Sequence, residues 1–590
     1  MLGNRFRAFG TTVSILLFVG IAMPPTKANL SSLSFATQVK PLEAEPQSLT
    51  SSTYDVIIKN GRIIDGAGNP WVSGDLAIQG DRIAAIGRFD GAKAKRVIDA
   101  SGLVVSPGFI DMLGQSEMAL LIDNRALSKL SQGITTEITG EGASVAPQDA
   151  LTLSSLAPEF DRYHLKIDWT SLDGYFARLE KTGTPLNIGT YVGAAQIRKA
   201  VLGNADRAPT SEELETMKGL VAQTMQQGAF GISTALIYPP GHYAKTDELV
   251  ELAKVAAQYG GIYSTHMRSE GKAEIAAIQE ALRIGREAHL PVEIFHLKVI
   301  GKRRWGSMPK LVAIIQAARD SGQDVSADMY PYVAGGTSLA ASLPPWVAEG
   351  GLHKLLERLQ DPVTRSKIKR EMSVEQSSWE NLFLDSGGAN GVFVAGIENA
   401  QLKKFDGQTI AQIAREQKKQ PLDALMDLVE EDRAQTGAIY FIAGEDDLQY
   451  GLKQPWTSLC LDASEESLDG PLFEPHDHPR AYGSMPRFLG HYVRDLHLLS
   501  LEQAIRKMTS LPAQRERLQE RGLLKEGYFA DITIFDPGTI RDRATYQNPA
   551  QISEGVKYVF VNGQLEFENG RLPGAAGGRA LRGRGWKQPD

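Results

Sequence analysis

Cysteine is nearly absent from this sequence, because Cys460 is the only one among 590 residues. A single thiol cannot form an internal disulfide bond, and zinc or iron–sulfur centres built from several cysteines are excluded as well. A metal ion in this protein therefore has to be held by histidine and carboxylate side chains.

An excess of charge of one sign is missing too. The 63 Lys and Arg residues against 70 Asp and Glu residues give a net charge of −7, and no basic run is long enough to follow a phosphate backbone. We therefore expect a small-molecule partner rather than a nucleic acid. With 42% hydrophobic and 23% charged residues, the composition is that of an ordinary globular protein, and it does not indicate an oligomeric state.

No hydrophobic run is long enough to span a bilayer. Residues 13–23 are apolar but fewer than the roughly 20 residues that a spanning helix needs, and they follow two arginines and precede small residues. This pattern is typical of a secretory signal peptide over residues 1–28, with a linker over residues 29–53. We expect a periplasmic or secreted protein without a stable membrane anchor after cleavage. A retained anchor is the alternative, because Pro24 and Pro25 lie close to the cleavage site.

Short segments with alternating hydrophobic and polar residues occur at both ends of the remaining chain. YDVIIKNGRIIDG begins residues 54–106, and VKYVFVNGQLEFENG belongs to residues 523–575. Asn60-Gly61 and Gln79-Gly80 are dipeptides typical of hairpin turns. We expect strands from both ends to form one small β-domain, followed by a tail over residues 576–590.

Residues 107–522 alternate strand-length apolar runs with amphipathic helices, which predicts an α/β fold of parallel βα units. Eight runs suit strands and favour a closed (β/α)8 TIM-like barrel. The runs are LVVSPGFID, TTEITG, NIGTYVG, AFGISTAL, GIYSTHM, VEIFHLKV, DVSADMYPY and TSLCLDA. The seventh and eighth runs are separated by far more residues than one helix requires, so we expect an inserted subdomain at about residues 339–450. Thr210 and Glu213 form a capping-box pattern ahead of one helix.

Polar side chains end several of these predicted strands, where the reacting groups of such barrels lie. Glu141 follows TTEITG, His266 and His296 end successive strands 30 residues apart, and Asp462 ends the last strand. Two imidazoles and a carboxylate suit a catalytic Zn²⁺ that keeps one position open for water, although another divalent metal is possible. Asp462 would then accept a proton from that water.

Each of these side chains also has a purely structural interpretation. A histidine that ends a strand is often only hydrogen bonded, and Glu141 could cap the helix that follows it. Asp462 could form a salt bridge with Lys298 or Arg480. The segment Tyr330-Pro331-Tyr332 is interpreted as a bend in the seventh strand rather than as part of a site.

Longer segments resemble the amidohydrolase superfamily and, within it, the D-aminoacylase (N-acyl-D-amino-acid deacylase) family. The matching segments include IIKNGRIIDGAG, VVSPGFID, QGITTEITG, GISTALIYPPG, YSTHMRSEG, FHLKVIG, HPRAYGSMPRFLG and LKEGYFADITIFDP. They extend from Tyr54 to about Pro537. The resemblance implies a β-sandwich built from both termini and a distorted (β/α)8 barrel with a late insertion. It also implies a zinc-dependent hydrolase that cleaves the amide bond of N-acyl-D-amino acids, which is a carbon–nitrogen bond other than a peptide bond.

The resemblance also implies roles for individual residues. Glu141, His266 and His296 would hold one zinc ion, with Glu141 in TGEGAS standing where the family has a cysteine. Water on that ion would be the nucleophile, and Asp462 would be the general base.

The substrate's carboxylate would be held by Tyr238, Lys298 and Arg480, although Arg480 could equally form a surface ion pair. The sequence departs from the family after PGFID, where the family has His-x-His and this chain has Leu113 and Gln115. Leu113 cannot bind a cation, so one zinc ion per chain is expected.

Two other function classes remain open. One is a hydantoinase-like or dihydroorotase-like enzyme that acts on cyclic or linear amides. The other is a non-catalytic relative that binds an amide ligand after the loss of His-x-His. The preferred acyl group and amino acid are not indicated by any residue pattern.

Overall fold

The computed structural model describes residues 53–149, 152–153, 162–376 and 378–588. The expected signal peptide and nearly all of the expected linker lie outside the described residues. Within the described part of the chain, no helix combines the length and the hydrophobicity needed to cross a membrane.

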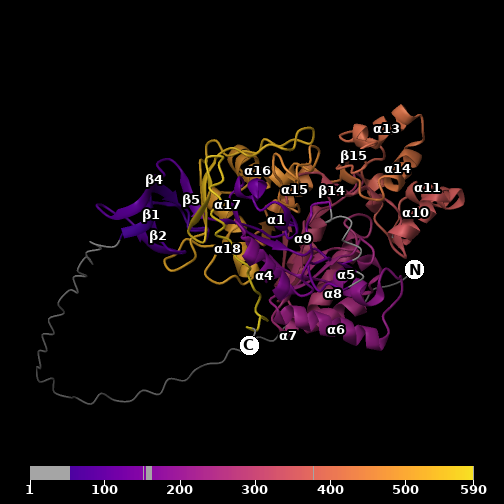
Figure 1. The fold of residues 1–590 in the computed structure, drawn as a ribbon, viewed down its shortest axis with the longest axis horizontal. Helices are drawn as coiled ribbons and strands as arrows, with labels where there is room; N and C mark the ends of the chain where they lie inside the picture. The colour runs from indigo at the N-terminus through magenta and orange to yellow at the C-terminus, as the bar shows by residue number, and fades with distance from the viewer. Residues whose placement is uncertain (1–52, 150–151, 154–161, 377, 589–590) are drawn as a thin grey trace, which may run out of the picture. The chain divides into compact units, whose positions relative to one another are not determined.

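Strands from both ends of the chain form one hydrogen-bonded sheet, as predicted (Figure 1). Its order is β20-β19-β18-β5-β1-β2-β3, and β4 pairs with β1 beside this path. The sheet branches because β1 pairs in parallel with β4 along its first part and with β5 at its end. The strands are β1 (Thr53–Ile63), β2 (Val72–Gln79), β3 (Arg82–Gly87), β4 (Lys93–Asp99), β5 (Val104–Pro107), β18 (Ile532–Phe535), β19 (Val556–Val561) and β20 (Gln564–Glu568).

One of the two predicted hairpin turns is wrong. Gly80 does turn the chain between β2 and β3, with φ +60°. Asn60 and Gly61, in contrast, lie inside β1 at a bulge, where Asn60 has φ 60° and the register with β2 shifts. Gly61 is needed there for a different reason, since a Cβ atom on it would lie 2.5 Å from Cγ2 of Val105.

The central strands form a parallel barrel, as predicted. Hydrogen-bonded pairing gives two arcs, β6-β7-β8 and β9-β10-β11-β12-β13-β17, in which β9 (Val192–Gly193) continues from β8. Backbone hydrogen bonds join the arcs: Asp462 donates to Leu113 at 2.8 Å, and Phe230 donates to Thr190 at 2.9 Å. The eight barrel strands are β6 (Phe109–Asp111), β7 (Ile134–Thr139), β8 (Asn187–Thr190), β10 (Gly231–Ala235), β11 (Ile262–His266), β12 (Val292–Ile294), β13 (Val325–Met329) and β17 (Thr457–Leu459).

Amphipathic helices pack around these strands and supply much of the largest hydrophobic core. The helix after Thr210 begins with the predicted capping box, in which Thr210 and Glu213 bond each other's backbone N–H groups. The helices that accompany the barrel include α4 (Leu172–Thr182), α5 (Ala194–Leu202), α6 (Ser211–Gln226), α7 (Thr246–Gln258), α8 (Glu274–Ala288), α9 (Met308–Asp320), α15 (Glu445–Leu452) and α17 (Leu501–Met508).

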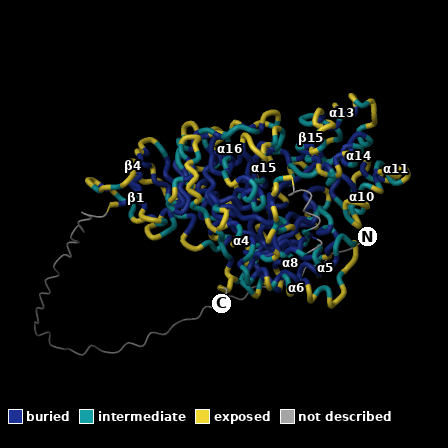
Figure 2. The backbone as a smooth tube through the Cα atoms, in the orientation of Figure 1, coloured by how far each residue is buried: buried dark blue, intermediate teal, exposed yellow. Residues whose placement is uncertain are grey.

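The long segment between β13 and β17 folds around a hydrophobic core of its own, visible as buried backbone in Figure 2. Its three strands pair antiparallel in the order β14-β16-β15. The first and the last of these strands in the chain, β14 and β16, therefore lie side by side. Its main elements are β14 (Gly335–Ser338), α10 (Leu352–Gln360), α11 (Pro362–Met372), β15 (Val392–Ala395), α13 (Ile410–Gln417), α14 (Pro421–Glu431) and β16 (Gly437–Tyr440).

The C-terminal segment lies along the barrel. Ile188 of β8 donates a backbone hydrogen bond to Arg579 at 2.9 Å, and Leu581 donates one back to Ile188 at 2.7 Å. The C-terminal segment therefore pairs with β8 on the side opposite to β7.

Candidate active site

A cavity of about 410 Å³ opens at the ends of the barrel strands, where the sequence predicts the site. All the predicted site residues line it, together with side chains from the inserted subdomain such as Leu382, Tyr440 and Ile442. The predicted residues are Glu141, Tyr238, His266, His296, Lys298, Asp462 and Arg480.

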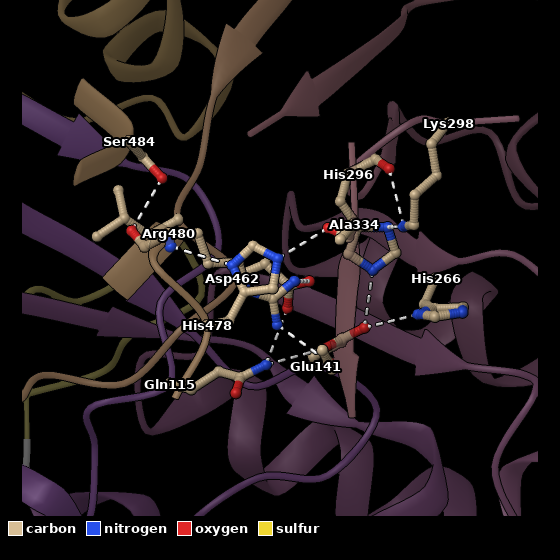
Figure 3. A network of polar contacts seen from close by, with 12 residues as sticks. Gln115, Glu141, His266, His296, Lys298, Ala334, Asp462, His478, Arg480 and Ser484 are labelled. Carbon is tan, nitrogen blue, oxygen red and sulfur yellow. Dashed lines mark hydrogen bonds and ion pairs between the residues drawn. The ribbon is translucent and has the colours of Figure 1, made fainter. Parts of the chain in front are cut away.

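Three side chains from different strands meet at one point of this cavity (Figure 3). Oε1 of Glu141 lies 3.0 Å from Nδ1 of His266 and 3.1 Å from Nε2 of His296. Glu141 follows β7 in a tight turn, and Gly142 is required next to it because a Cβ atom there would lie 2.6 Å from the backbone nitrogen of Ala235. Burial and this turn hold the three potential ligand atoms within 4.8 Å of one another.

The electrostatics of this group suit a cation. Burial opposes charge on Glu141, but the hydrogen bonds from His266 and His296 hold its pKa well below the usual range. Burial and Lys298 oppose protonation of His296, yet Glu270, Asp462 and Glu141 together raise its pKa to about 10. A proton therefore occupies this group at neutral pH when no metal is bound, and a metal ion would replace it. One carboxylate oxygen and two imidazole nitrogens are a donor set that zinc favours, so the residues present fit this ion.

Backbone strain fixes two of the side chains. His296 has φ +35° and Asp462 has φ +52°, a region that residues other than glycine rarely adopt. The N–H of His296 donates to Oδ1 of Asp328 at 2.7 Å, and that of Asp462 donates to the carbonyl of Leu113 at 2.8 Å. Such conformations cost about 1–3 kcal/mol each and persist where neighbours enforce them.

The second carboxylate of the site is held from both sides. Oδ2 of Asp462 accepts a hydrogen bond from Nη1 of Arg480 at 2.6 Å, and Oδ1 accepts one from Nε2 of Gln115 at 3.0 Å. Burial and the nearby charge of Glu141 raise the pKa of Asp462, while Arg480 lowers it. His478 fixes Arg480 in turn, because its Nδ1 accepts the backbone N–H of Arg480 at 3.0 Å.

Lys298 contacts His296, one of the potential metal ligands, and the neighbouring Glu270. Its Nζ lies 2.8 Å from Oε1 of Glu270, 2.7 Å from Nδ1 of His296 and 3.1 Å from the carbonyl of His296. Nδ1 of His296 also lies 3.1 Å from Oε1 of Glu270, so when Nδ1 carries a proton it donates that proton to Glu270, and Lys298 donates to Glu270 and to the carbonyl of His296. In this arrangement Lys298 acts on His296 rather than presenting a free charge to the cavity.

Tyr238 and Tyr330 form aromatic walls. The ring centroid of Tyr238 lies 5.4 Å from that of His266, and burial raises the pKa of Tyr238 well above its usual value, so its phenol stays protonated. Tyr330 corrects the interpretation of its segment as only a bend: it lines the cavity, and the guanidinium of Arg480 lies 4.9 Å from its ring centroid. Tyr330 directly follows β13, so the rule that selected the other strand-end residues would have selected it as well.

Glu270 and Gln115 are also part of the site and were not predicted as functional residues. Lys298, together with the histidines, lowers the pKa of buried Glu270 to about 2 despite its burial. Sequence spacing could not indicate this pair, because Glu270 lies in the loop after β11 and Lys298 in the loop after β12.

A second group of potential ligands, His266, Glu270 and Glu380, shares one imidazole with the first. Glu270 is already paired with Lys298, and burial raises the pKa of Glu380 to about 8. A protonated carboxyl group and a neutralised carboxylate are poor ligands, so the group around Glu141 is the stronger metal site.

Comparisons with known proteins identify relatives of this chain. A sequence model of the Amidohydrolase family matches residues 467–567. A D-aminoacylase of Alcaligenes xylosoxydans xylosoxydans is 36% identical over 535 residues, which cover 90% of this chain and 98% of that protein.

Two solved structures are similar over most of the chain. The N-acyl-D-glutamate deacylase from Bordetella bronchiseptica, complexed with zinc and a phosphonate inhibitor that mimics the tetrahedral intermediate, has a TM-score of 0.75 at 32% identity and covers 90% of this chain and 100% of that one. A D-aminoacylase with a binuclear metal center, described by one-metal activation and second-metal attenuation, has a TM-score of 0.75 at 34% identity with the same coverage.

Proposed function

Because the chain belongs to the D-aminoacylase family of amidohydrolases, we propose that it hydrolyses the amide bond of N-acyl-D-amino acids at the Glu141, His266 and His296 site. The observation that carries this proposal is the convergence of these three side chains beside Asp462 in one cavity. When bound there, zinc supplies a Lewis acid that polarises the acyl carbonyl and lowers the pKa of water.

Asp462 is the proton carrier in this mechanism. It lines the cavity and its pKa is raised by burial, which suits a group that must accept and then release a proton. Asp462 takes the proton of the attacking water and returns it to the leaving nitrogen. Arg480 and Gln115 hold the carboxylate in the orientation that both transfers require.

The substrate is positioned by donors that the described residues leave unused. Nε of Arg480 and the hydroxyl of Tyr330 are buried and have no hydrogen-bond partner among the described residues. Both lie on the wall beside Asp462, so they can hold the α-carboxylate, and Tyr238 offers a neutral phenol to the acyl oxygen. Fixing a remote charge in this way orients the scissile bond and contributes to the rate.

Activity on a substrate panel tests the proposal. The zinc-loaded protein should hydrolyse N-acetyl-D-amino acids and leave their L-enantiomers intact. Turnover of hydantoins or dihydroorotate in place of these substrates would favour a cyclic-amide hydrolase. Binding of N-acetyl-D-amino acids without turnover would identify a non-catalytic relative.

We also propose that the protein acts outside the cytoplasm, after cleavage near residue 28 and without a membrane anchor. The support is the pattern of two arginines, a short apolar run and small residues at the N-terminus.

A further inference from the structure

The carboxamide of Gln115 lies between two carboxylates of the site. Its Nε2 donates to Oε2 of Glu141 at 3.2 Å and to Oδ1 of Asp462 at 3.0 Å (Figure 3). A carboxamide nitrogen has two hydrogens, and both are used here. One neutral group therefore ties the metal-ligand carboxylate to the proton-accepting carboxylate.

Two carboxylates that face one another repel, and proteins usually compensate with a cation or with hydrogen-bond donors. The other two oxygens already have partners, because Oε1 of Glu141 contacts both imidazoles and Oδ2 of Asp462 accepts from Arg480. The two oxygens that Gln115 binds are those that a bridging cation would take.

Among the described residues, no third His, Cys, Asp or Glu side chain joins Glu141 and Asp462 in a candidate metal group. Leu113, two positions before Gln115, is fully buried in an apolar cluster. Gly114 cannot carry a side chain, since a Cβ atom there would lie 2.0 Å from Cγ of Glu137. Two carboxylate oxygens alone are fewer ligands than zinc requires in protein sites.

We propose that Gln115 is a positioning residue that occupies the place of a second cation, so that the centre holds one metal ion and Asp462 is oriented by a neutral hydrogen-bond bridge. The inference rests on the proposed function only for the identity of the first ion. It concerns this chain's own residues, and it contrasts with the D-aminoacylase that is described as having a binuclear center.

Metal content tests the proposal without any substrate. Wild type and Gln115→His are saturated with zinc, freed of loosely bound ions by gel filtration, and analysed for zinc per chain. Wild type should retain one ion. Gln115→His removes the bridge and adds an imidazole beside the two carboxylate oxygens, so it should retain two. Gln519→His, at an exposed glutamine far along the chain, controls for zinc bound to any introduced histidine and should retain one.

Gln115→Met tests the positioning role, because methionine has a similar length but no donor. It should retain one zinc, keep KM within about 3-fold, and lose about 10- to 100-fold in kcat, as changes around metal ligands typically do. Two retained ions in wild type, one ion in Gln115→His, or an unchanged kcat in Gln115→Met would each overturn the proposal. Should wild type hydrolyse no N-acyl-D-amino acid at all, the proposed function fails, and the metal counts still decide the role of Gln115.

Discussion

Nη1 of Arg480 donates a hydrogen bond to Oδ2 of Asp462 at 2.6 Å, and both side chains are buried. The sequence left open whether Asp462 is a general base or only a salt-bridge partner of Arg480. The structure shows that the ion pair exists within the cavity, so the two interpretations are compatible. A buried base held by a buried cation has a pKa that depends on that cation.

This ion pair predicts a pH effect with a definite sign. Asp462 must be deprotonated to accept a proton, so kcat falls as pH decreases through its pKa. Burial raises this pKa and Arg480 lowers it, so Arg480→Gln should move the acid limb of the kcat profile to higher pH. The measurement is kcat against pH at saturating substrate for wild type, Arg480→Gln and Arg480→Lys. If the acid limb of the kcat profile of Arg480→Gln stays in place or moves to lower pH, Asp462 is not the general base.

The sequence was sufficient for the parts of the site that follow from strand order. Parallel strands bring their carboxyl ends to one edge of a barrel, so His266, His296 and Asp462 could be placed together from position alone. Tyr330 follows the same rule, although the sequence of its segment favours a bend in the seventh strand rather than a site. The motif resemblance supplied Tyr238, which no periodicity indicates.

Contacts between loops could not be predicted in this way. The bridge made by Gln115 and the pairing of Lys298 with Glu270 depend on side-chain directions after the strands have ended. The positive φ angles of His296 and Asp462 accompany backbone N–H bonds to Asp328 of β13 and to Leu113 just after β6, and no local propensity indicates them. Asn60 illustrates a different error, because its local sequence predicts a hairpin turn and the structure has a bulge inside a long strand there.

Lys298 allows two roles to be distinguished. The family resemblance implies that it holds the substrate's carboxylate, whereas in the structure its ammonium binds Glu270 and His296. If Lys298 orients His296, Lys298→Met should weaken zinc binding by about 10- to 100-fold. The measurement is a competition titration with a zinc chelator, with Tyr238→Phe as a cavity variant that should keep full zinc affinity. Unchanged zinc affinity together with a raised KM in Lys298→Met would show that it binds substrate instead.

Export is tested by the mature N-terminus. The basic, apolar and small-residue pattern over residues 1–28 predicts cleavage near residue 28 and recovery of the protein outside the cytoplasm. Fractionation of the native cell followed by N-terminal sequencing should find a chain that begins near Asn29. Recovery of full-length chains in the membrane fraction would instead favour the retained anchor.

Substitution of the proposed base and of a proposed ligand should give different metal contents. Asp462→Asn keeps the shape of the side chain but cannot accept the proton, so it should retain zinc and lose about 10² to 10⁴ in kcat. His296→Ala removes one of the three candidate ligand atoms, which come from Glu141, His266 and His296, so zinc content itself should fall and activity should partly return with excess metal. Zinc per chain is measured for both variants before any kinetics.

If Asp462→Asn loses zinc as completely as His296→Ala, Asp462 is a primary ligand and another group must move the proton. If both variants keep zinc and full activity, the reaction takes place elsewhere in the barrel, because neither the proton acceptor nor the metal ligand assigned to this cavity would then be needed.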